Sequence, residues 1–179
     1  MKNKIKIIAS WLIVLITTAG SLGSTPTSAV ERLLAKYNNA DEEIVVELDD
    51  YVNTSNLTDK QNESYKNVYL KQFRDMKYEI KEELVDGDNA PVTAQITVYD
   101  YYKAENDAND YLANNNEEFM TDGEYDEGKF VDYKLKKLDE VTDTVDYTID
   151  FTLTKVDNDW IVNELTNEQL EKIHGVYEY

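Results

Sequence analysis

The apolar residues in the first part of the chain repeat at the spacing of α-helix faces. After a capping residue at Ser28, the first stripe follows the i, i+3, i+4, i+7 spacing, and Thr58 with Gln61 forms a capping box that predicts a later helix start. The three stripes are Val30/Leu33/Leu34/Tyr37, Ile44/Val45/Leu48/Tyr51/Val52 and Tyr65/Val68/Tyr69/Phe73. The first two predict either two helices or one helix kinked near Asn38 and Asn39.

After Asp75 the apolar spacing changes to two, which is typical of strands that bury one face. Asp86-Gly87-Asp88 and Asp157-Asn158 predict the turns of two hairpins. The predicted strands are residues 76–85, 92–102, 144–154 and 160–162. The clearest is the third, where apolar residues from Val145 to Leu153 alternate with Thr and Asp without exception.

Residues between the two hairpins predict a helical insertion. Helices are expected over 103–120 and 127–138, although Phe130 and Tyr133 leave a strand alternative for the second, and Thr166 with Gln169 caps a last helix. The order of elements predicts an α+β fold, in which N-terminal helices pack on a curved antiparallel sheet of about four strands.

Residues 1–20 have the pattern of a bacterial export signal. Lys2, Lys4 and Lys6 precede an apolar run from Ile7 to Ala19. The run is shorter than the roughly 20 residues of a membrane-spanning helix, so cleavage is the favoured interpretation and an uncleaved anchor the alternative. The expected organisation is a signal segment at 1–20, a flexible tether at 21–28 and a single domain at 29–179.

Ser21 stands where the lipid-bearing cysteine of a bacterial lipoprotein would be. The small residues Thr18-Ala19-Gly20 precede it and a Ser/Thr/Gly/Pro stretch follows. A serine cannot take the thioether lipid, so the alternatives are a lipoprotein that has lost its anchor residue, which we favour, or release by ordinary signal peptidase.

Charge and composition exclude several classes of protein. The leader holds three of the 18 Lys and Arg and none of the 37 Asp and Glu, so the rest of the chain carries a formal charge of −22. Such a chain does not track nucleic-acid phosphates and is repelled by an anionic bilayer, so only the N-terminus is expected to meet the membrane. The sequence has no Cys, which excludes thiolate metal sites and disulfides, and it has no phosphate-binding glycine motif.

The order of these elements resembles a known fold family. The hairpin MKYEIKEELVDGDNAPVTAQITVYDYYKA and the closing pair VDYTIDFTLTKVDNDWIVNEL resemble the cystatin-like, nuclear-transport-factor-two-like cone of exported proteins from low-GC Gram-positive bacteria. With the Ser21 position, the chain resembles the uncharacterised surface lipoproteins of those bacteria. The family includes isomerases, dehydratases and interaction modules, so the resemblance implies a fold and selects no activity.

Two carboxylates form the candidate catalytic group. Enzymes that the cone resembles place an acid with a His or Tyr in its mouth, and here Asp146 and Asp150 share one strand face, with Tyr101 as a nearby hydroxyl. The favoured interpretation of that face is a solvated sheet surface. The lone His174 is expected to be a packing or surface residue.

Ligand and metal sites are less defined by the sequence. Tyr99, Tyr101 and Tyr102 are a candidate aromatic rim for a ligand, although tyrosines also border ordinary cores. Residues 122–128 are acidic but lack the EF-hand spacing, so no dedicated metal site and no cofactor are expected. We therefore expect an exported, membrane-associated, non-enzymatic module for an unknown protein or small molecule; the alternative is a cofactor-free isomerase or dehydratase.

Overall fold

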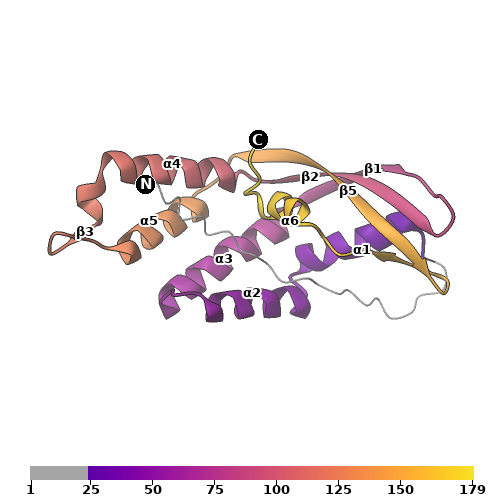
Figure 1. The fold of residues 1–179 in the computed structure, drawn as a ribbon, viewed down its shortest axis with the longest axis horizontal. Helices are drawn as coiled ribbons and strands as arrows, with labels where there is room; N and C mark the ends of the chain where they lie inside the picture. The colour runs from indigo at the N-terminus through magenta and orange to yellow at the C-terminus, as the bar shows by residue number, and fades with distance from the viewer. Residues whose placement is uncertain (1–23) are drawn as a thin grey trace.

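Six α-helices and a four-stranded antiparallel sheet make up residues 24–179, the part of the chain that the computed structural model describes (Figure 1). The helices are α1 (Pro26–Asn39), α2 (Glu42–Thr54), α3 (Asp59–Asp75), α4 (Tyr101–Asn114), α5 (Glu127–Asp139) and α6 (Asn167–His174). The sheet strands are β1 (Lys77–Glu83), β2 (Asn89–Tyr99), β5 (Thr144–Val156) and β6 (Asp159–Val162), in the order β1-β2-β5-β6. A 3₁₀ turn, η1 (Asn116–Phe119), precedes a short hairpin of β3 (Met120–Thr121) and β4 (Glu124–Tyr125).

The predicted α+β class is confirmed, with three helices before the sheet and a helical insertion between its two hairpins. The sheet is open along both edges and does not close into a barrel. Within residues 24–179, no helix has both the length and the apolar character needed to cross a membrane.

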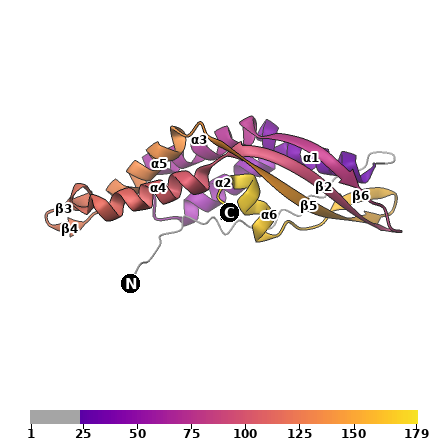
Figure 2. The same ribbon diagram turned by 90° about the horizontal axis from the view of Figure 1, so that it is seen from above.

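The alternation of β2 and β5 gives the sheet one buried and one exposed face. Ala94 lies opposite Ile149 and Thr93 opposite Asp150, so apolar positions of both strands share the inner face and polar positions share the outer face. Helices α1, α3 and α6 pack on the inner face. Figure 2 shows these helices and the sheet in a view of the molecule from above. The buried inner-face residues are Ala90, Val92, Ala94, Ile96, Val98, Tyr147, Ile149, Phe151 and Leu153.

The start of the folded body lies earlier than the sequence predicts. Thr25, not Ser28, caps α1, and Ser28 completes the capping box by accepting from the Thr25 N–H at 2.9 Å. The expected flexible tether at 21–28 therefore overlaps the first turn of α1. Helices α1 and α2 are separate because Ala40 adopts a left-handed conformation (φ 49°), one residue beyond the predicted kink.

The first helix of the insertion is displaced from its predicted position. Strand β2 ends at Tyr99, and buried Asp100 accepts the Lys103 N–H at 3.0 Å, so α4 begins at Tyr101 rather than 103. The helix ends at Asn114 rather than 120, in an Asn-rich stretch where the Asn115 side chain bonds the Tyr111 carbonyl. Helix α5 confirms the predicted helix at 127–138 and excludes the strand alternative.

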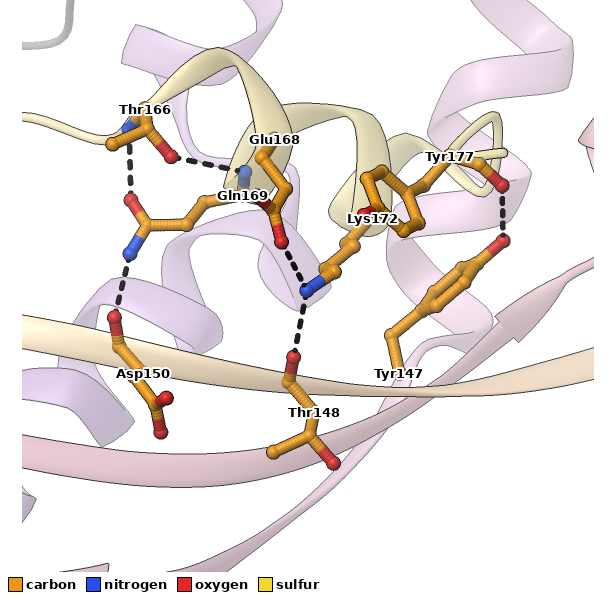
Figure 3. A network of polar contacts seen from close by, with 8 residues as sticks. All are labelled: Tyr147, Thr148, Asp150, Thr166, Glu168, Gln169, Lys172 and Tyr177. Carbon is orange, nitrogen blue, oxygen red and sulfur yellow. Dashed lines mark hydrogen bonds and ion pairs between the residues drawn. The ribbon is translucent and has the colours of Figure 1, made fainter. Parts of the chain in front are cut away.

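Helix α6 covers the part of the β5 edge that β6 leaves without a strand partner. Strand β6 pairs only with Leu153–Val156. Beyond that point the Gln169 amide donates to the Asp150 carbonyl at 2.7 Å, and the Lys172 ammonium donates to the Thr148 carbonyl at 3.1 Å (Figure 3). These side chains satisfy carbonyls that would otherwise face an open edge.

Candidate functional site

Helices α4 and α5 extend beyond the sheet as an arm that ends in the β3–β4 hairpin (Figure 1). The arm has its own small core, made of Ala108, Phe119 and Phe130. The Phe119 and Phe130 rings meet edge to face with centroids 5.5 Å apart. This packing holds the two helices side by side beyond the main core, to which both also contribute residues such as Tyr101 and Leu135.

A groove of about 490 Å³ runs between α4 and α5. The α4 residues that line the groove recur every three or four positions, so they share one face of the helix. Two of them, Ala104 and Ala108, are small and leave room between the helices. The remaining lining comes from α5 and the loop that leads to β5. The α4–α5 groove is lined by Asp100, Lys103, Ala104, Asp107, Ala108, Tyr111, Tyr133, Lys137, Glu140, Val141, Thr142 and Asp143.

Two stacked tyrosines contribute an aromatic surface to the groove. The rings of Tyr111 and Tyr133 lie 4.9 Å apart at 18°, and the Tyr111 hydroxyl donates to Glu118 at 3.0 Å, which raises the pKa of Tyr111. The Lys137 ammonium lies 5.6 Å from the centroid of the Tyr133 ring. The stack therefore already has a cation near one ring face.

Exposed ion pairs occupy the lip of the groove. Lys103 lies 3.3 Å from Asp143 and 4.0 Å from Asp107, and the bond with Asp143 raises the pKa of Lys103. Lys137 lies 3.4 Å from Glu140. With buried Asp100, the lining holds four carboxylates against two ammonium groups.

A buried lysine joins the two helices below the surface. Lys134 of α5 is only 1% exposed, burial lowers its pKa, and the charge of Glu105 on α4 opposes that shift. Its ammonium lies 5.4 Å from the centroid of the Phe130 ring. An ammonium at this depth is stable only with compensating interactions, and the attraction of the Glu105 carboxylate is one of them.

The structure does not bring the candidate catalytic residues together. Asp146 and Asp150 lie on the exposed outer face of the sheet, where Asp146 accepts from Thr97 and Gln95, and Asp150 accepts from Thr93 at 2.6 Å. Tyr101 is fully buried in the helical layer, and its hydroxyl donates to the Val68 carbonyl at 3.0 Å. The two carboxylates therefore lie on a solvated sheet face, and Asp146, Asp150 and Tyr101 do not form one site.

The three tyrosines of the candidate rim are not equally exposed: Tyr99 and Tyr101 stack with ring centroids 6.1 Å apart, and Tyr102 packs elsewhere. Tyr99 is half-buried and donates to Asp75 at 2.6 Å, whereas Tyr101 belongs to the core. Tyr102 is half-buried against Tyr179, with ring centroids 5.5 Å apart. They do not line one surface, although the residue between them, Asp100, lies in the wall of the α4–α5 groove.

His174 is a core residue, in agreement with the packing interpretation. Its ring lies 5.6 Å from Tyr69 and 5.5 Å from Phe73, and burial lowers its pKa to about 3. It is therefore neutral near physiological pH.

The acidic segment at 122–128 forms a turn and a helix cap. Asp122 and Gly123 have positive φ in the β3–β4 turn, and Asp126 accepts from the Lys129 N–H at 3.2 Å, which starts α5. Across residues 24–179, no group of three or more His, Asp or Glu side chains is placed to hold a metal ion.

Sequence reasoning missed the groove because α4 has a weak apolar stripe. The signal that could have revealed it is the combination of Ala104 and Ala108 with Tyr111 at helical spacing, since small inward residues leave space between helices. The α5 half, Tyr133 and Lys137, has the same four-residue spacing. Which helix the α4 residues would face depends on tertiary packing.

Comparisons with known proteins assign no family. No family model matches the chain, and no curated protein matches it. One solved structure with some similarity is a Bacillus subtilis protein, ycdA, described as a "putative lipoprotein". It is 14% identical with a TM-score of 0.44, and the match covers 83% of this chain but 46% of that one. The chain thus spans less than half of that protein's length, and similarity at this level assigns neither fold nor function.

Proposed function

We propose that this chain is an exported, non-enzymatic interaction module, held at the outer side of the cell membrane by its N-terminus. The single observation that carries the proposal is the placement of two features at opposite ends of the sheet. The folded body begins beside one end of the sheet, and the α4–α5 groove starts at the other end, where α4 follows β2 and the loop after α5 leads into β5 (Figure 1).

The N-terminal end of the body is joined firmly to the sheet. The Ser24 hydroxyl accepts from the Trp160 N–H at 2.8 Å, and the Thr27 N–H donates to Glu83 at 2.9 Å. These bonds place the entry of the chain beside β6 and the end of β1. An anchor preceding residue 24 would therefore hold this end and leave the arm directed away from it.

The charge of the body supports a position away from the membrane surface. Residues 24–179 contain all 37 acidic residues and 15 of the basic ones, a formal charge of −22. An anionic leaflet repels such a body, whereas a lysine-led apolar leader is attracted to it. The expected arrangement is a module that stands off the membrane and presents its arm.

Surface labelling of intact bacterial cells tests the proposal. Because the sequence has no cysteine, the Tyr125→Cys variant at the arm tip and the Asn158→Cys variant in the β5–β6 turn each carry one thiol. A membrane-impermeant maleimide should label both in intact cells, and a bulky polymer-linked maleimide should label the arm tip faster. Labelling only after lysis would overturn export, and equal rates with the bulky reagent would overturn the orientation.

The lipoprotein history is tested at Ser21, which lies outside the described residues. A Ser21→Cys variant expressed in a Gram-positive host should incorporate labelled fatty acid. Absence of the label, with normal export of the same variant, would count against a lost lipid anchor. Recovery of the wild-type chain from the culture medium alone would contradict membrane attachment.

A further inference from the structure

We propose that the α4–α5 groove binds a basic peptide segment of a partner protein, with an arginine or lysine side chain seated between the two helices. The inference deepens the proposed function, because it names the ligand of the module. It depends on three features of the same groove: exposed carboxylates, an aromatic face and an apolar floor.

The carboxylates of the lip are available to an incoming cation. The side chains of Asp107 and Asp143 are 70% and 73% exposed, and they share the single ammonium of Lys103. Exposed ion pairs of this kind contribute little to stability, so a partner's cation can replace or join Lys103 without a large penalty. A guanidinium group would also gain the paired hydrogen bonds that a carboxylate accepts.

The tyrosine stack suits the planar head of an arginine. Lys137 already lies within cation–π distance of Tyr133, so this ring accommodates a cation, and an arginine of the partner would have to displace that ammonium. Ala104, Ala108 and Val141 supply apolar surface for the methylene stem of a long cationic side chain. The space of about 490 Å³ lies in the range of sites that enclose a ligand of a few side chains.

Charge complementarity decides between a basic and an acidic partner. The groove has two more carboxylates than ammonium groups, and the body around it carries −22. This field attracts a basic segment from a distance and repels an acidic one.

Titration calorimetry on the full-length chain in a non-ionic detergent tests the assignment. The probe is a short capped peptide in which arginine alternates with alanine, with a glutamate–alanine peptide and spermidine as comparisons. We expect saturable binding of the arginine peptide, weaker binding of spermidine and none of the glutamate peptide. The Asp107→Asn/Asp143→Asn variant should lose about tenfold in affinity, because two charge-assisted contacts are removed.

A matched variant separates the groove from the overall charge. Asp88→Asn/Asp157→Asn makes the same change in net charge on exposed side chains at the opposite end of the molecule, and should bind as wild type does. Thr142→Trp, a substitution at an exposed position of the lip, should block binding by filling the groove.

Each contrary result overturns the inference. Equal weakening by both double variants would show binding by the general field, equal affinity for spermidine would indicate a small polycation, and binding of the glutamate peptide would reverse the charge assignment. Failure here leaves surface labelling unaffected, and failure of labelling leaves the binding measurement unaffected, so the two proposals are tested separately.

Discussion

Replacement of Gly175 by alanine should destabilise the fold far more than the same change at Gly87. Gly175 ends α6 with φ 74°, and its carbonyl accepts the Tyr102 N–H at 2.7 Å. A methyl group at Gly175 would overlap the Tyr99 backbone carbonyl and the Gln72 side-chain amide. At Gly87 (φ 61°), a methyl group would meet open space.

The two substitutions share one cost and differ in another. A left-handed conformation costs alanine about 1–2 kcal/mol at either position. Only Gly175 adds the overlap with buried backbone, and overpacking of this kind costs about 1–3 kcal/mol. We expect a loss of about 2–5 kcal/mol in the free energy of unfolding for Gly175→Ala and about 1–2 kcal/mol for Gly87→Ala.

Urea unfolding of residues 24–179 measures this difference. Trp160 is the one tryptophan in this segment and is buried, so its fluorescence reports global unfolding. The reasoning is refuted if Gly175→Ala lowers the free energy of unfolding by no more than Gly87→Ala, since the close approach of α6 to the end of β2 would then have no energetic consequence.

Three further predictions concern buried or partly buried polar groups. Glu47 is half-buried and near Glu43, and burial raises its pKa to about 7, so the stabilisation by its protonated form is lost as pH rises from about 4.5 to 7. Glu47→Gln should therefore raise the free energy of unfolding by about 1 kcal/mol at pH 8 and change it little at pH 4.5. Thermal unfolding at both pH values measures this difference. Burial lowers the pKa of His174 to about 3, so the unfolded state binds a proton that the folded state does not, and stability falls as pH drops from 6.5 towards 3. In urea titrations over pH 6.5–4, a His174→Leu variant should show a shallower fall in the free energy of unfolding than wild type. An unchanged slope would contradict the burial of His174. The Gln72 side chain is fully buried; it donates to the Tyr99 carbonyl and accepts from the Tyr99 N–H. Gln72→Leu leaves these two backbone groups without that partner, so it should lower the free energy of unfolding by about 2–3 kcal/mol in urea. A neutral result would refute this role.

Much of the architecture could be read from short-range pattern. The alternation from Val145 to Leu153 predicts both the existence of β5 and its inward face, and the Thr58–Gln61 capping box marks the N-terminus of α3 to the residue. These features depend on contacts between residues close in sequence, so a local pattern carries them. Two helix starts were missed: Thr25 rather than Ser28 caps α1, and Asp100 caps α4. Each cap lies beside a long-range hydrogen bond that no local pattern shows, from the Trp160 N–H to Ser24 and from the Tyr179 hydroxyl to Asp100 at 2.7 Å.

The candidate site is a product of tertiary packing. The sequence determined the order of the main helices and strands, the acidic charge and the position of Asp146 and Asp150 on one strand face, because each follows from composition or a fixed spacing. Only the structure decided that this face is exposed, that Tyr101 is core and that α4 and α5 enclose a groove. Which side of a sheet helices cover, and which helix faces which, depends on burial summed over residues far apart in the chain, and no local spacing encodes that sum.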